Sequence, residues 1–449
     1  MSYQNSFSAA QIIFHSPVLK ESLGIRINYV SYLENMIKLV QWGQEKYVQA
    51  ELAFYRQRLC KSLSDIGQER YLPPHISNFI PFDLASVLGF HPQYPGFQDK
   101  VKVLADQCAR DFGAAEGWSS YFTLALRAAT SGDPALWAKI LCGADRLSAD
   151  YLQFFLLVRD NAEFVNRAPL RILVTATMSA GKSTLINGLV GKKVNLTRNL
   201  ACTSKTHIIL SKPYEDGCTT EYDKDIVFDA DSNTLLTDND ENPSNRITVS
   251  TCFQSGLKGE RLVLMDTPGI NSSENETHSQ ITQQVVQEGQ YDVIFYVLNA
   301  TQLRTMDDEV HLKFIAHHSG GKPVFFVLNK TDQLLAEEDD LIGLVQRQQS
   351  YLESLGFSEP MIFPISAKAV SLAQKALREP LGRIERREFE NLSDAFNQMN
   401  FCAWYEKLLQ GNIYIPWNSS EAKNLLRNCG FAYLEKFLAE LSQNHAGSK

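Results

Sequence analysis

The sequence predicts an α/β fold, in which a domain with a mostly parallel sheet is flanked by an N-terminal helical bundle and C-terminal helices. Apolar runs of strand length recur through the middle of the chain, and each one ends in a turn of small or polar residues. On both sides, apolar residues repeat at three- and four-residue steps, which is typical of amphipathic helices. We therefore expect an N-terminal helical region at 1–167, a sheet domain at 168–370 and a C-terminal helical region at 371–449.

The first turn of the sheet domain predicts a phosphate-binding loop. The segment Ala176-Thr-Met-Ser-Ala-Gly-Lys-Ser183 follows the apolar run 170–174 and precedes the helical pattern 184–190. Small residues let several backbone N–H groups approach a polyphosphate, and alanine at the first position, where the general pattern has glycine, is also small. In such a loop Lys182 reaches the terminal phosphates and the Ser183 hydroxyl can bind Mg²⁺. The predicted phosphate-binding residues are Ser179, Ala180, Gly181, Lys182, Ser183 and Thr184.

A second strand ends in a segment that suits the metal and the γ-phosphate. The apolar run 262–265 leads into Asp266-Thr-Pro-Gly269. An aspartate at a strand end can hold the water shell of a magnesium ion, and the Gly269 N–H can sense the γ-phosphate.

Two further strands predict recognition of guanine. The run 323–328 leads into Asn329-Lys-Thr-Asp332, and the run 361–365 leads into Ser366-Ala-Lys368. Asp332 can accept hydrogen bonds from N1 and the exocyclic amine of guanine, whereas adenine has no such pair of donors, so the pattern favours GTP. The second loop is the one that contacts the base oxygen in guanine sites. The predicted base-binding residues are Asn329, Lys330, Asp332, Ser366, Ala367 and Lys368.

With these motifs in this order, the chain resembles P-loop GTPases of the translation-factor-related class, and more narrowly the dynamin family in its bacterial dynamin-like branch. The narrower resemblance covers about residues 168–370. It depends on Ser179–Leu189, Ala201–Ser204, Asp266–Asn271 with the segment after it, and Tyr291–Ala300 with Asp308 downstream. It implies an enzyme that hydrolyses GTP with Mg²⁺ and couples this to conformational change and to homodimerisation through the nucleotide face.

The resemblance also assigns roles to single residues. Thr203 matches the switch threonine that closes onto magnesium and the γ-phosphate, and Ser204 is its neighbour and competitor. A second interpretation makes Thr203 a hydroxyl that caps a loop. The resemblance implies catalytic roles for Lys182, Thr203 and Gly269, and a metal site made by Ser183, Thr203 and Asp266.

Two positions depart from the family pattern. Dynamins that cut membranes usually carry a glutamine at the position of Met178, where it is thought to help orient the attacking water. Neither Met178 nor Ile270 can position water in that way. We therefore expect slow intrinsic hydrolysis, or a catalytic group supplied by a second protomer, with Met178 otherwise packing as an irregular apolar filler.

Three hypotheses about function stay open. The first is a dynamin-like mechanoenzyme whose helical regions act on a membrane. The second is a regulatory GTPase that recruits a protein partner without remodelling membranes, and the missing apolar or strongly basic tip of a membrane-inserting paddle motivates it. The third is a nucleotide-binding pseudo-enzyme, which Met178 and Ile270 motivate.

Composition and charge agree with an enzyme of several domains. The chain has 449 residues, of which 44% are hydrophobic, so sizeable cores can form. A net charge of −8 argues against nucleic acid as a partner and against general adhesion to acidic lipid. No run approaches the roughly 18 apolar residues that a spanning helix needs. The eight cysteines are scattered, which is typical of reduced thiols. We expect a cytoplasmic protein, with a peripheral membrane location left open.

The flanking regions give only coarse predictions. The apolar period at 29–54 predicts one long helix, and 151–165 predicts another directly before the phosphate loop. Loops are expected at Pro73-Pro74 and at 81–96 because proline and glycine interrupt helices.

The insertion between the phosphate loop and Asp266 and the C-terminal region complete the picture. Segments 221–231 and 246–252 predict an extended hairpin around an acidic turn at 238–243. C-terminal helices are expected at 370–378, 386–408 and 422–441, the last with a break at Asn428-Cys-Gly430.

Overall fold

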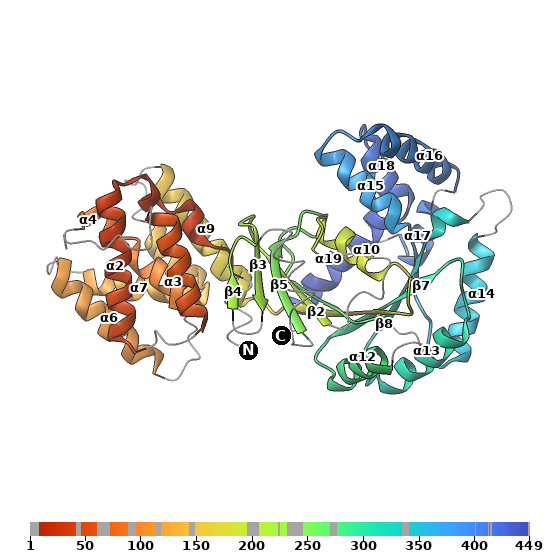
Figure 1. Ribbon diagram of the computed structural model, residues 1–449, viewed down its shortest axis with the longest axis horizontal. Helices are drawn as coiled ribbons and strands as arrows, with labels where there is room; N and C mark the ends of the chain where they lie inside the picture. The colour runs from red at the N-terminus through yellow and green to blue at the C-terminus, as the bar shows by residue number, and fades with distance from the viewer. Residues whose placement is uncertain are drawn as a thin grey trace. The chain divides into compact units, whose positions relative to one another are not determined.

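The computed structural model describes residues 9–41, 46–60, 72–88, 96–112, 118–142, 149–194, 206–222, 225–230, 246–269, 276–334, 341–399, 401–411, 413 and 415–447. The chain divides into two compact units. We call Met1–Ala168 with Lys212–Ala230 the helical unit, and Pro169–Ser211 with Asp231–Lys449 the sheet unit. Figure 1 follows the chain through both.

The helical unit is built from helices around a core rich in aromatic rings. Phe82 stacks on Trp137 at 5.8 Å between ring centroids, and Phe79 meets Phe154 edge-on at 5.4 Å. Such pairs add to the gain from burying the rings. Its elements are η1 (Ile12–His15), η2 (Pro17–Lys20), α2 (Leu23–Leu39), α3 (Lys46–Leu59), α4 (Pro74–Ser77), α5 (Ile80–Leu88), α6 (Phe97–Phe112), α7 (Trp118–Ser131), α8 (Pro134–Leu141), α9 (Ala149–Asn166), β3 (Cys218–Tyr222) and β4 (Asp225–Val227).

Two predictions about these helices are wrong and one is confirmed. Residues 29–54 are not one helix, because α2 ends at Leu39, Gln41 takes a positive φ of 53°, and α3 then packs against α2. Two packed helices show the same apolar period as one. Pro81 begins no loop but lies in the first turn of α5, where its missing N–H is not needed. The helix predicted at 151–165 is α9.

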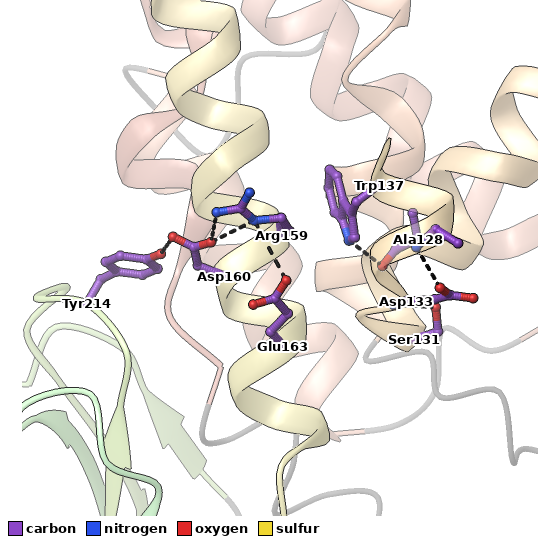
Figure 2. Close-up of polar contacts among 9 residues, drawn as sticks. Ala128, Ser131, Asp133, Trp137, Arg159, Asp160, Glu163 and Tyr214 are labelled. Atoms are coloured by element: carbon purple, nitrogen blue, oxygen red, sulfur yellow. Dashed lines mark hydrogen bonds and ion pairs between the residues drawn. The ribbon is translucent and has the colours of Figure 1, made fainter. Parts of the chain in front are cut away.

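The segment 212–230 is attached to the helical unit by polar contacts. The Tyr214 hydroxyl donates to Asp160 on α9 at 2.8 Å, and Arg159 reaches the same carboxylate (Figure 2). Arg58 on α3 pairs with Asp229 at 2.5 Å. The single strand predicted at 221–231 is wrong, since β3 and β4 pair with each other in antiparallel fashion. The predicted acidic turn at 238–243 lies outside the described residues.

The sheet unit confirms the predicted α/β fold with a mostly parallel sheet. Its strands are β1 (Leu170–Ala176), β2 (Thr206–Lys212), β5 (Arg246–Cys252), β6 (Leu262–Asp266), β7 (Val293–Asn299), β8 (Val324–Asn329) and β9 (Ile362–Pro364), in the spatial order β5-β2-β6-β1-β7-β8-β9. β1 is parallel to β6 and β7, and β8 is parallel to β7 and β9. β2 is antiparallel to β6.

Helices cover both faces of this sheet. Figure 1 shows α12 (Glu276–Glu288), α13 (Met306–His318) and α14 (Leu341–Ser354) on one face, and α10 (Lys182–Val190) with the C-terminal helices on the other. The C-terminal helices are α15 (Ala367–Arg378), α16 (Arg383–Met399), α17 (Cys402–Leu408), α18 (Glu421–Asn428) and α19 (Phe431–Gly447).

The C-terminal helices follow the sequence predictions closely. The break predicted at 428–430 separates α18 from α19, and Gly430 there has a φ of 84°. The helix predicted at 386–408 is two helices, α16 and α17. Tyr405 joins them to the sheet: it donates to the Pro364 carbonyl at 2.8 Å and stacks on Tyr433 of α19. The three-domain division at 167 and 370 stays a prediction.

Candidate nucleotide site

The predicted site residues lie at the carboxyl ends of neighbouring parallel strands. The phosphate loop follows β1, Asp266 ends β6, Asn329 ends β8, and Ser366 follows β9. Parallel strands place these ends at one edge of the sheet, where open α/β folds bind ligands. The fold therefore brings together segments that are up to about 190 residues apart in the sequence, on the pattern expected for such sheets.

The loop between β1 and α10 has the backbone form of an anion cradle. Ser179 takes a positive φ of 60°, Gly181 takes 87°, and α10 begins at the next residue, Lys182. The free N–H groups at the start of α10 therefore lie beside the loop, and a helix N-terminus favours negative charge. Ser183 and Thr184 lie in the first turn of the same helix.

Lys182 and Asp266 form an ion pair across this loop. The ammonium contacts the carboxylate of Asp266 directly, and the two side chains are only 10% and 5% exposed. Gly269, three residues beyond Asp266, lies against Met178, since a Cβ placed at Gly269 would be 3.3 Å from Met178 Cγ. The predicted phosphate and metal residues of these two segments are thus neighbours.

Asn329 connects the phosphate loop with the loop after β9. Its amide donates to the Ala180 carbonyl at 2.9 Å, and its side-chain oxygen accepts from the Ala367 N–H at 2.9 Å. Asn329 is buried, and the space around its amide leaves no room for a Cβ at Gly181. A single side chain therefore joins the two ends of the candidate site.

The predicted base-binding residues also contact one another. Ser366 donates to Asp332 at 2.6 Å and caps α15 by accepting from the Ala369 N–H at 3.0 Å. Lys330 adopts a left-handed φ of 65°, which turns the chain between Asn329 and Asp332. The ammonium of Lys368 lies instead on Glu388 of α16, at 2.5 Å.

Several predicted residues cannot be placed. Thr203 and its neighbour Ser204 lie outside the described residues, as does Ile270. Their roles stay predictions.

The sequence analysis named Asp308 without a role and missed the polar group that it forms behind the phosphate loop. Thr175 and Thr177 flank the end of β1 and contact His311 and Asp308 of α13. Burial raises the pKa of Asp308 and lowers the pKa of His311 to about 3, so His311 is neutral near pH 7. The pattern Thr305-x-x-Asp308 was available as a signal, but it predicts a helix cap rather than a contact with the loop.

Comparison with known proteins identifies the domain. Residues 172–331, from β1 to the segment after β8, match the model of the dynamin family. This chain carries a dynamin family GTPase domain. The resemblance to the dynamin family is therefore confirmed for these residues, and this family consists of GTP hydrolases.

Individual relatives are distant. GTPase Era of Lacticaseibacillus paracasei is 24% identical over 197 residues, which are 44% of this chain and 48% of that protein. Dynamin-like protein 2 of Campylobacter jejuni is 22% identical over 247 residues, 54% of this chain and 37% of that protein. The chain thus spans half or less of these relatives. A solved structure of an oligomerised bacterial dynamin pair aligns with 98% of this chain and 64% of its own, at 16% identity and a TM-score of 0.37.

Among the described residues, no helix combines the length and the apolar character needed to cross a bilayer.

Proposed function

We propose that the chain binds GTP with Mg²⁺ at the edge of the sheet, hydrolyses it, and couples the nucleotide state to self-association. The observation that carries this proposal is the pair of hydrogen bonds made by Asn329. They hold the phosphate loop and the loop at 366–368 in one arrangement. A ligand with a phosphate end and a base end fits such an arrangement better than phosphate alone.

The phosphate end supports phosphoryl transfer to water. Lys182 and the N–H groups at the start of α10 are preorganised donors, which stabilise the negative charge that spreads over the γ-phosphate oxygens. The Gly269 N–H is the proposed reporter of the γ-phosphate. Because its neighbour Met178 cannot orient water, this half of the site supplies charge stabilisation more than it positions the nucleophile.

The donors near Lys182 fit magnesium. The Ser183 hydroxyl and the Asp266 carboxylate are oxygen ligands, the type that Mg²⁺ prefers, and the resemblance adds Thr203 to the set. Bound Mg²⁺ would neutralise phosphate charge. Asp266 is buried and forms an ion pair with Lys182, so a positive charge already lies beside its carboxylate.

The base end supports a choice of guanine. Asp332 is half-buried and held by Ser366, which orients its carboxylate. A carboxylate fixed in this way can accept from the two donors of guanine. Adenine has no such donors, so the carboxylate would stay unpaired if adenine were bound.

In a dimer, the second protomer would supply the water-orienting group that Met178 cannot provide. The family match and the resemblance motivate this part of the proposal, in which two protomers meet at their nucleotide faces. Action on a membrane surface is the corresponding hypothesis for the biological target.

The test is GTP turnover measured against protein concentration, with light scattering to follow association. We expect specific activity to rise as dimers form, and Lys182→Ala to lower turnover by about 10²-fold or more. The exposed Lys193→Ala, beyond the end of α10, is the matched control and should turn over like wild type. A Lys182-dependent specific activity that does not change with protein concentration would contradict catalysis by a dimer. Turnover equal in both lysine variants would contradict hydrolysis at this site.

Vesicle co-sedimentation with and without GTP tests the target. Nucleotide-dependent binding supports the membrane hypothesis. Normal turnover without vesicle binding would contradict it and favour a switch that recruits a protein.

A further inference from the structure

A polar network lies behind the phosphate loop: the resemblance includes Asp308 but gives it no role, and the proposed function does not use it. The Thr177 hydroxyl, at the start of the loop, donates to Asp308 Oδ1 at 2.9 Å. The Tyr296 hydroxyl of β7 donates to the same oxygen at 3.2 Å. One turn along α13, His311 Nε2 lies 2.9 Å from the Thr175 hydroxyl.

Asp308 belongs both to this network and to the first turn of α13. Thr305 caps α13 by accepting from the Asp308 N–H at 3.2 Å. In a reciprocal capping box the side chain at Asp308 would reach back to the backbone of Thr305. Here Asp308 Oδ1 accepts from the hydroxyls of Thr177 and Tyr296, so the first turn of α13 is tied to the phosphate loop.

Burying this carboxylate has a cost. Asp308 is 2% exposed, and burial raises its pKa, which the hydroxyls of Thr177, Tyr296 and Thr305 counteract. Without Asp308, the half-buried hydroxyl of Thr177 would lose this charged acceptor. The arrangement therefore fixes Thr177 more firmly than loop packing alone would.

Thr177 precedes Met178, the residue that lies against Gly269, which is the predicted γ-phosphate contact. The next residue, Met178, lies against Gly269: a Cβ at Gly269 would be 3.3 Å from Met178 Cγ and 3.4 Å from Met178 Cα. A displacement of Thr177 moves Met178, and a displacement of Met178 changes the space that Gly269 occupies. The path from α13 to the reacting end of the nucleotide thus runs through the Asp308–Thr177 hydrogen bond, the peptide bond to Met178, and the contact of Met178 with Gly269.

We propose that Asp308 is a positioning residue for GTP hydrolysis, which acts through the Thr177 hydroxyl to hold Met178 against Gly269. The inference rests on the proposed role of Gly269. It predicts that loss of the contact affects turnover, which needs the γ-phosphate end, more than it affects the binding of GDP, which lacks that phosphate.

The experiment compares Thr177→Val, Asp308→Ala and the double variant, by kcat and KM for GTP and by the affinity for fluorescent GDP. Each single variant should lower kcat about tenfold, the scale of one hydrogen bond to a charged group, and leave GDP affinity within about twofold. The double variant should be no slower than either single variant, because both changes break one contact. Asp308→Asn keeps an acceptor oxygen and should restore most of kcat. Thr130→Val, which removes a hydrogen-bonded threonine hydroxyl in the helical unit, is the control.

Three results would overturn the inference: unchanged kcat in Thr177→Val, a loss of GDP affinity equal to the loss in kcat, or single effects that multiply in the double variant. Should Asp308→Ala fail to fold, Thr177→Val and Asp308→Asn still decide the matter. Failure of the proposed function looks different, since wild type itself would then show no Lys182-dependent turnover.

Discussion

The sheet unit and the helical unit both bury charged side chains, but they bury them in different places. In the sheet unit, Lys182, Asp266 and Asp308 surround one loop at the ends of the strands. In the helical unit, Asp83 and Glu51 are fully buried among the helices, where Asp83 accepts from α2 and α3 and Glu51 accepts from Ser86 on α5. The first arrangement is suited to a charged ligand, and the second holds a core together.

The buried charges of the helical unit have hydroxyl and charged partners of their own. Asp83 accepts from the hydroxyls of Tyr29 and Tyr55, and burial raises its pKa to about 6. Lys212 donates to Asp216 and to Thr219, both at 2.8 Å. The comparison teaches that a buried charge by itself does not mark a site, and that its position relative to strand ends does.

The largest effect is expected from Gly181→Ala in the sheet unit. A Cβ there would collide with the Asn329 amide, and alanine is strained at a φ of 87°. We expect GTP and GDP affinity to fall by about 10²-fold, from left-handed strain together with the loss of the two Asn329 hydrogen bonds. Fluorescent nucleotide titration measures it.

The control is a second glycine with a positive φ, at which an added Cβ meets no other atom. Gly320→Ala has a similar φ of 63° with no atom within 4 Å of the new Cβ. It should lower stability slightly and leave nucleotide affinity unchanged. Equal affinity in Gly181→Ala and wild type would contradict the role given to Asn329.

A smaller effect is expected from Glu51→Gln in the helical unit. Burial raises the pKa of Glu51 to about 8 even though Lys212 and a bond from Gln11 lower it and Asp216 raises it further. The folded state therefore binds a proton that the unfolded state has released between about pH 4.5 and 8, and stability falls as pH rises through that window. Removing this titration should stabilise the helical unit by about 2 kcal/mol at pH 8 relative to wild type.

Hydrogen exchange of α3 and α5 at pH 5 and pH 8, corrected for intrinsic rates, measures this effect. The exposed Glu163→Gln on α9 is the control and should keep the wild-type pH dependence. If stability changes with pH equally in wild type and in Glu51→Gln, the titration of Glu51 is not the cause of the pH dependence.

The smallest effect is expected from Lys368→Ala. Its ammonium pairs with Glu388 at the surface, and exposed pairs contribute less than about 1 kcal/mol. GTP affinity should change by less than about twofold, since the Ala367 N–H, not the lysine side chain, holds the Asn329 contact. A tenfold loss of affinity would place the Lys368 side chain at the base after all.

The sequence predicted the sheet unit better than the helical unit for a physical reason. Its site residues follow one another within short segments, each at the end of an apolar strand, so spacing alone predicts their roles. The contact between Thr177 and Asp308 joins residues 131 positions apart and left no local pattern. The helical unit consists mostly of such distant pairs: Tyr29 with Asp83, and Gln11 with Asp216.

Periodicity also failed where the chain turns without a strong breaker. The apolar stripe at 29–54 continues through the turn at Gln41, because both helices face one core. At Gly430 the opposite holds, and a glycine with positive φ marked the break correctly.

The central claim is that the phosphate loop and the two base-binding loops form one guanine-nucleotide site. Its most direct test is displacement of fluorescent GDP by GDP, ADP and xanthosine diphosphate, in wild type and in Asp332→Asn. Wild type should prefer GDP to ADP by about 10²-fold or more, and Asp332→Asn should turn the preference toward xanthosine diphosphate, which has a carbonyl where guanine has an amine. Equal displacement by GDP and ADP in wild type would contradict the account.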